Sequence, residues 1–137
     1  MTRSTRSDRG SVSALVAVVA TGLVMVAGLA YDGGQIVTAQ ATARDLAANA
    51  ARAGAQEIDL DELRATGRTA LDADAATQAA AEYLARTGHR GTVAVNGPSI
   101  TVSVHVVQPM LILPLPDRTV TATDTATAQT GPEQTGG

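Results

Sequence analysis

The chain has 137 residues, a formal net charge of −3 and no cysteine. This length suits one modest domain, and the absence of cysteine excludes disulfides and thiolate metal sites. Residues 32–137 carry 7 Arg against 12 acidic residues, a balance that argues against a nucleic-acid surface.

An uncharged segment of small and aliphatic residues begins at Ser11 and ends at Ala30. Twenty helical residues span about 30 Å, which matches the hydrocarbon core of a bilayer. We therefore predict a transmembrane helix over residues 11–31, with the lipid bilayer as a partner of the chain.

Three basic residues, Arg3, Arg6 and Arg9, precede this helix. The positive-inside bias then places residues 1–10 in the cytoplasm and everything after Tyr31 outside the cell membrane. The sequence predicts a single-pass protein with an extracytoplasmic C-terminal domain.

Two other interpretations of the segment stay open. A secretory signal peptide also has a basic start, and Gly28-Leu29-Ala30 offers a small-x-small cleavage site. However, the apolar region of a signal peptide usually has about 7–15 residues, which is shorter than this one. A buried core helix would need a larger soluble core than this chain can build. We favour the retained anchor.

Small residues recur four positions apart on one face of this helix, at Ser13, Ala17 and Thr21. Such spacing lets two membrane helices approach closely. An Ala-rich composition also produces it by chance, so membrane-helix packing at this face is a hypothesis.

An Ala-rich pattern follows and predicts a helical stalk over residues 32–88. Its small and apolar residues keep a three-and-four spacing and form one stripe: Ile36, Ala39, Ala43, Leu46 and Ala50. Because an Ala stripe buries little area, we expect it to pack against neighbouring subunits. The stretch Asp32-Gly33-Gly34 before it is a candidate flexible joint.

Two further helices are expected in this region. Asp59 or Asp61 is placed to cap a short helix, and a second helix is predicted over Asp74–Arg86, with Gly88 as its stop.

The period of the pattern changes to two beyond residue 88, which predicts an antiparallel β region over 89–129. Alternating runs cover 92–95, 99–107 and 119–128, with a turn signal at Asn96-Gly97. One face is apolar and the other carries hydroxyls, as in a sheet with one wet face. The fold class is therefore α+β: an N-terminal transmembrane helix, Ala-rich amphipathic helices and a small antiparallel sheet. Residues 130–137 are predicted to be a disordered tail.

An apolar stretch, PMLILPLP, lies between the last two runs, at Pro109–Pro116. Its three prolines forbid a continuous strand or helix. Its large apolar side chains include Met110, Leu111, Ile112 and Leu113. Either the loop folds over the sheet and completes the core, or it is a contact site for a partner or for the outer membrane face.

No constellation of catalytic residues is recognisable. His89 and His105 lack the spacing of metal ligands, and the acidic run Asp59–Glu62 lacks the glycine and terminal Glu of a calcium loop. We expect no enzymatic activity, no cofactor, no metal and no small-molecule substrate.

The N-terminal half carries a recognisable combination. Arg9-Gly10-Ser11 opens the apolar helix, an Asp followed by Gly ends it, and ATARDLAANAARAGAQ follows at Ala41–Gln56. Over residues 9–57 this resembles the TadE/TadG-like proteins of Flp (Tad) pilus-assembly systems. The resemblance implies a non-catalytic minor pilin or pseudopilin in the cell envelope, whose partners are other pilus-assembly or pilin-like membrane proteins.

The resemblance also makes Gly10 and Ser11 a candidate processing site. Family members cut by a prepilin peptidase are typically cleaved after a Gly and carry Glu at the fifth position beyond it. Leu15 stands there in this chain, which favours an unprocessed anchor, while cleavage after Gly10 or after Ala30 stays open. The rival function is a secreted or membrane-anchored binding or sensor domain unrelated to pili.

Overall fold

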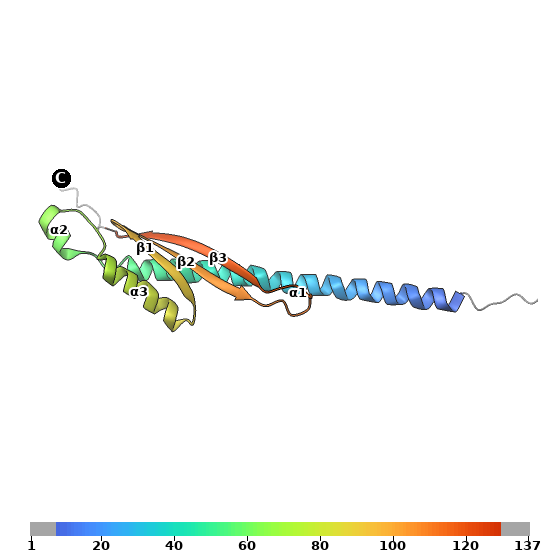
Figure 1. Cartoon of the computed structure of the whole chain (residues 1–137). Coiled ribbons are helices and arrows are strands. Elements are labelled where there is room, and N and C mark those ends of the chain that lie inside the picture. The colour runs from blue at the N-terminus through green and yellow to red at the C-terminus, as the bar shows by residue number, and fades with distance from the viewer. Residues whose placement is uncertain (1–7, 130–137) are drawn as a thin grey trace, which may run out of the picture.

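The computed structural model describes residues 8–129 and shows an elongated molecule built on one long helix (Figure 1). The helices are α1 (Asp8–Gly54), α2 (Leu60–Thr66) and α3 (Ala73–Arg86), and the strands are β1 (Arg90–Asn96), β2 (Ser99–Gln108) and β3 (Arg118–Thr127). The predicted α+β class, with an apolar N-terminal helix and a small antiparallel sheet, is confirmed. The predicted tail over 130–137 lies outside the described residues.

Helix α1 is continuous for 47 residues, a length of about 70 Å at 1.5 Å per residue. The flexible joint predicted at Asp32-Gly33-Gly34 is therefore wrong. Two glycines cost a helix about 1 kcal/mol each relative to alanine, but they break none of its backbone hydrogen bonds. The flanking turns on both sides hold the helix together across them.

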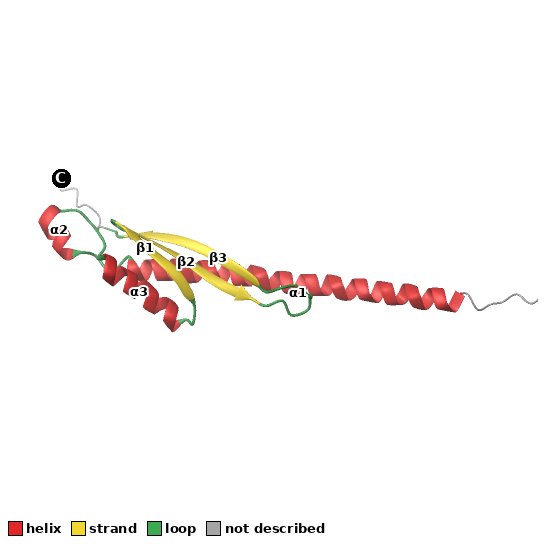
Figure 2. Ribbon diagram, viewed as in Figure 1, coloured by secondary structure: helices red, strands yellow, loops and turns green. Residues whose placement is uncertain are grey.

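The three strands form one antiparallel sheet in the order β1-β2-β3. The second half of α1 contacts β2 and β3, while α3 contacts β1 and α1, so both helices cover the same face (Figure 2). The regions 32–88 and 89–129, which the sequence suggested as a stalk and a separate β region, are thus two layers of one domain.

The core lies between these layers. β2 contributes three β-branched side chains, Ile100, Val102 and Val104, which have no exposed surface. Alanines of α1 and α3 face them, and Leu84 of α3 is 2% exposed. Small side chains on the helices let the backbones approach the sheet closely. At Gly91 of β1, an added Cβ would stand 2.9 Å from the Leu84 side chain.

Side-chain caps define the ends of the short helices. Asp59 accepts the backbone N–H groups of Asp61 and Glu62 through its carboxylate, so Asp59 is the cap of α2 and Asp61 is not. Asp72 caps α3 in the same way. Gly88, the predicted stop of α3, has a φ of +74° just beyond the helix, a conformation that glycine adopts without steric cost.

The other face of the sheet is polar and exposed, as the alternation predicted. Neighbouring strands join across it by a ladder of side-chain hydrogen bonds: Ser99–Thr127 at 3.1 Å, Thr101–Thr125 at 2.9 Å, Ser103–Thr123 at 2.7 Å and His105–Thr121 at 2.9 Å. Such cross-strand pairs fix the register of β2 against β3.

We expect Gly34→Ala and Gly54→Ala to change stability in opposite directions. At Gly34 an added Cβ meets nothing within 4 Å, so alanine raises the free energy of unfolding by up to about 1 kcal/mol through helix propensity. At Gly54 it would stand 2.8 Å from the carbonyl oxygen of Ala76 and against the Ile100 side chain, so overpacking lowers stability by about 1–3 kcal/mol. Urea unfolding of the full chain in mild detergent, followed by circular dichroism, measures both variants. A destabilising Gly34→Ala would contradict a continuous α1, and a neutral Gly54→Ala would contradict the close approach of α1 to α3.

Candidate functional site at the end of the apolar helix segment

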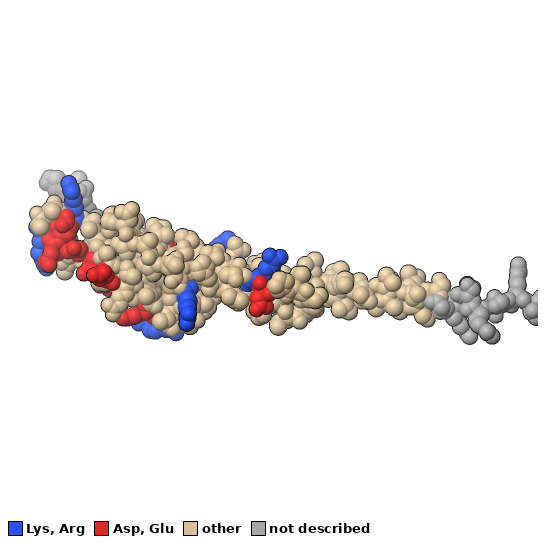
Figure 3. Space-filling model, viewed as in Figure 1, with Lys and Arg blue, Asp and Glu red and all other residues tan. Residues whose placement is uncertain are grey.

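The first part of α1, Ser11–Tyr31, protrudes from the domain and is here named the apolar segment (Figure 1). Its Val, Leu and Met side chains are 52–71% exposed. No charged residue lies within it, and the face seen in Figure 3 is uncharged along this part, whereas acidic and basic side chains are spread over the domain, from the end around α2 to the point where the uncharged part begins. By length and composition, α1 is able to cross a membrane.

The predicted packing residues Ser13, Ala17 and Thr21 are all exposed on this segment. The Thr21 hydroxyl donates to the carbonyl oxygen of Ala17 at 2.8 Å. This satisfies the hydroxyl inside its own helix, and the domain covers none of the three side chains. Their role in contacts between helices stays a prediction.

Both candidate cleavage sites lie inside α1. The Gly10–Ser11 bond follows shortly after the helix begins at Asp8, and Ala30 lies in its middle. Cleavage after Ala30 would remove almost all of the apolar segment but leave the part of α1 that packs on the sheet.

Asp32 directly follows the apolar segment and is 2% exposed. Its carboxylate accepts three consecutive backbone N–H groups of the Pro109–Pro116 loop: Leu111 at 3.3 Å, Ile112 at 3.2 Å and Leu113 at 2.8 Å. These bonds join residues about eighty positions apart in the chain. They fasten the loop between β2 and β3 onto α1, and we name this arrangement the Asp32 clasp.

The clasp stabilises the ionised form of the carboxyl. The N–H of Leu113 contributes most to lowering the pKa of Asp32 below its ordinary value, burial opposes it, and the N–H groups of Leu111 and Ile112 lower the pKa further. The result is a lowered pKa, as expected for a carboxylate that accepts several backbone hydrogen bonds. The sequence pattern placed Asp32 only in a candidate flexible joint and did not predict this role.

The loop Pro109–Pro116, here named the apolar loop, does not lie over the sheet. It lies beside α1 at Gly28, where an added Cβ would stand 2.7 Å from Cγ2 of Ile112. Leu111, Ile112 and Leu115 remain about half or more exposed, whereas Met110 and Leu113 are half-buried. The loop is absent from the core cluster around β2, so the interpretation that it completes the core over the sheet is wrong. A contact role stays a prediction.

The predicted stalk stripe is used within the chain. Ala39, Ala43, Leu46 and Ala50 are buried and Ile36 is half-buried, because the second half of α1 packs against β2, β3 and α3. This differs from the expected packing against neighbouring subunits. The expectation failed because an Ala stripe fits any close backbone, and the chain's own sheet supplies one.

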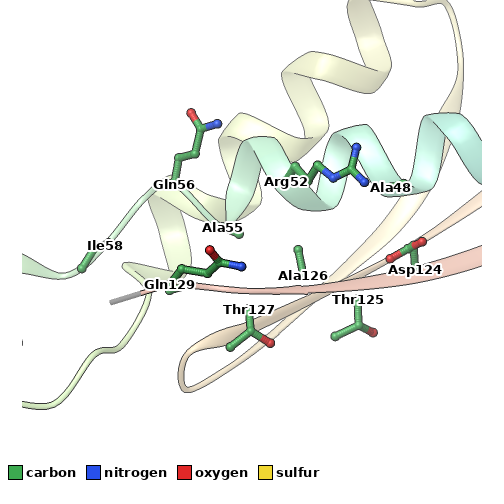
Figure 4. Close-up of a pocket in the computed structure, with 11 residues that line it drawn as sticks. Ala48, Arg52, Ala55, Gln56, Ile58, Asp124, Thr125, Ala126, Thr127 and Gln129 are labelled. Atoms are coloured by element: carbon green, nitrogen blue, oxygen red, sulfur yellow. The ribbon is translucent and has the colours of Figure 1, made fainter. Parts of the chain in front are cut away.

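An open groove of about 790 Å³ lies between the end of α1 and β3 (Figure 4). Arg52 and Gln56 line it from α1, and Asp124, Thr125 and Thr127 line it from β3. All five side chains are exposed. Ala48, Ala55, Ala126 and Ala128 also line it, and within residues 8–129 no ion pair joins Arg52 to Asp124.

The two histidines lie apart from this groove in ordinary hydrogen bonds. His89 has Nδ1 at 2.8 Å from the carbonyl oxygen of Thr87, and His105 belongs to the hydroxyl ladder. Over residues 8–129, no group of three His, Asp or Glu side chains is placed to hold a metal ion.

No protein-family model, no curated protein and no solved structure matches this chain.

The lowered pKa of Asp32 predicts an acid-sensitive clasp. Its stabilising contribution is complete above the ordinary aspartate pKa of about 3.9 and is lost as the pH falls through the lowered pKa, because only the carboxylate accepts all three N–H groups. We expect the amide proton of Leu113 to shift upfield at a pH below 3.9, measured by NMR on the full chain in micelles. Asp32→Asn, the matched control, abolishes this titration. Titration of the Leu113 amide at or above the ordinary value would contradict the clasp.

Proposed function

We propose that this chain is a non-enzymatic, membrane-anchored structural or assembly component of a Tad/Flp-type pilus, similar to a minor pilin or pseudopilin. Its N-terminus lies in the cytoplasm and its domain outside the cell membrane. One observation carries the proposal: a single helix is an exposed apolar rod of bilayer length over its first part and the spine of a domain over its second part.

A helix that continues without a break from the membrane into the domain suits a subunit whose domain keeps one orientation relative to the membrane and to neighbouring subunits. Because α1 has no break between the apolar segment and the domain, a movement or contact of the rod is passed directly to the sheet. A flexible tether would anchor a binding domain equally well, but it would leave the orientation of the domain free. A stiff helix gives every subunit the same orientation to its neighbours.

Within this proposal, contacts between subunits fall on the apolar segment. The Ala stripe of α1 is occupied by the chain's own sheet, so it is not available to a partner. The small residues Ser13, Ala17 and Thr21 remain exposed and have the spacing that lets two membrane helices approach closely. The apolar segment thus makes two kinds of contact, with lipid and with the apolar segments of neighbouring subunits.

The second candidate function is a membrane-anchored binding domain unrelated to pili. The observation that favours it is the open groove beside β3, which has an Arg and an Asp on opposite sides. Such a domain needs the rod only as an anchor, so any apolar helix of the same length would serve.

Replacing the small residues tests the proposal. In cells that lack the native gene, we expect the triple variant Ser13→Leu, Ala17→Leu, Thr21→Leu to stay in the membrane fraction but to lose piliation, because bulky side chains separate the helices. Deleting Ser11–Tyr31 releases a soluble protein that also supports no pili. Pili are counted by electron microscopy, and the chain is located by fractionation.

The matched control is Val12→Leu, Val16→Leu, Val19→Leu, which changes exposed side chains that are already large. It retains piliation. Normal piliation in the deletion strain would reject the pilus function. Normal piliation in the small-residue variant alone would reject contacts between subunits through this face and would favour the anchored binding domain.

A further inference from the structure

We propose that the apolar loop Pro109–Pro116 is a second membrane-contacting element, which lies in the interface of the outer leaflet beside the end of the apolar segment. The inference rests on the proposed membrane anchoring of α1 and adds to it. The domain is then attached to lipid at two points, through one spanning helix and one interfacial loop.

The position of the loop along α1 is the first argument. The Ile112 and Leu113 side chains pack on Gly28, and the Asp32 clasp holds the loop backbone one turn further along. Both contacts are at the end of the apolar segment. In Figure 1 the loop between β2 and β3 extends past the sheet along α1 toward this segment. When the segment spans a bilayer, the loop is therefore at the level of the membrane surface.

The surface of the loop is the second argument. Leu111 is 66%, Ile112 48% and Leu115 50% exposed. Nearby on α1, Leu29 and Tyr31 are 64% and 47% exposed, and no charged residue lies between Pro109 and Pro116. A patch of this kind is unfavourable in water. Continuity with the apolar segment identifies its occupant as the same bilayer.

The backbone of the loop is the third argument. Its three prolines have no N–H group. Four of its five other N–H groups have a described acceptor: those of Leu111, Ile112 and Leu113 are donated to Asp32, and that of Leu115 is donated to the Leu113 carbonyl at 2.8 Å. Backbone donors in a membrane must be satisfied inside the protein. Asp32 thus removes the main cost of placing an irregular loop there.

The carbonyl groups of the loop set its depth. The carbonyl oxygens of Pro109 and Leu113 each accept one of the described hydrogen bonds. A loop carbonyl without a protein partner needs water or a lipid headgroup as its donor. The hydrocarbon centre supplies neither. The loop therefore lies at the boundary of headgroups and acyl chains, the depth of about 5–10 Å that interfacial elements reach.

Tryptophan fluorescence tests the proposal directly, because the chain contains no tryptophan. The full chain is reconstituted in phosphatidylcholine vesicles with one reporter at a time: Leu111→Trp in the loop, Leu23→Trp in the apolar segment and Ala81→Trp on the exposed face of α3. Lipids brominated near the headgroup end of the acyl chains quench a tryptophan at the interface. We expect blue-shifted, quenched emission from Leu111→Trp, and red-shifted, unquenched emission from Ala81→Trp.

The three reporters separate the two proposals. Quenching of Leu23→Trp without quenching of Leu111→Trp would overturn the loop's role and leave the anchor intact. If Leu23→Trp is itself not quenched by lipid brominated at any depth, the anchoring fails and the loop's role fails with it. Blue-shifted emission from Leu111→Trp that lipid brominated at any depth does not quench would show that a second copy covers the loop, which also overturns the proposal.

The clasp supplies an independent test of the same geometry. In the Leu111→Trp background, Asp32→Ala leaves three loop N–H groups without their acceptor. We expect a loss of lipid quenching and a red shift, while Asp45→Ala, the change of an exposed aspartate on α1, alters neither. Unchanged quenching in the Asp32 variant would overturn the role of Asp32 in holding the loop at the interface.

Discussion

Helix α1 must remain one uninterrupted hydrogen-bonded rod while its two parts face different surroundings. Its apolar segment exposes large aliphatic side chains on every side, whereas its second half presents a narrow stripe of alanine to a sheet. A break between the parts would separate the domain from the rod. The side chains change from Val and Leu to Ala along the helix, whereas the helical backbone continues unchanged.

The packing of the rest of the domain depends on the small volume of the alanine side chains. Alanine buries little apolar area, so it contributes less than leucine or valine would to the hydrophobic effect. In exchange, alanine lets the helix backbones approach the sheet closely. The larger side chains of the core come from β2 and from Leu84 of α3. Gly54 and Gly91 lie where backbones come closest, and a side chain at either position would collide with a carbonyl oxygen or a core side chain. Tight packing compensates for a shortage of large residues.

The Asp32 clasp connects this domain to the rod at a second place. Without it, the loop between β2 and β3 would be held to α1 mainly by its apolar contacts at Gly28. With it, a buried carboxylate and three backbone donors satisfy one another, which is the condition for burying a charged group at acceptable cost. The clasp lies at the boundary between the apolar segment and the polar domain. It thereby holds the loop between β2 and β3 against the end of the apolar segment.

The sequence by itself determined the elements that depend on local pattern. Unbroken apolarity predicted the apolar segment, and period-two alternation predicted the strands and the polar, exposed face of the sheet. The positions of Asp59 and Gly88 predicted the start of α2 and the end of α3. Tertiary structure alone decided what depends on contacts between distant residues. An Ala stripe has no intrinsic partner, so only the folded chain shows that the sheet covers it. Asp32 and the apolar loop are about eighty residues apart, and no local pattern records that a carboxylate and three N–H groups will meet. The joint predicted at Gly33 and Gly34 failed for a related reason, because glycine permits a break in a helix without requiring one.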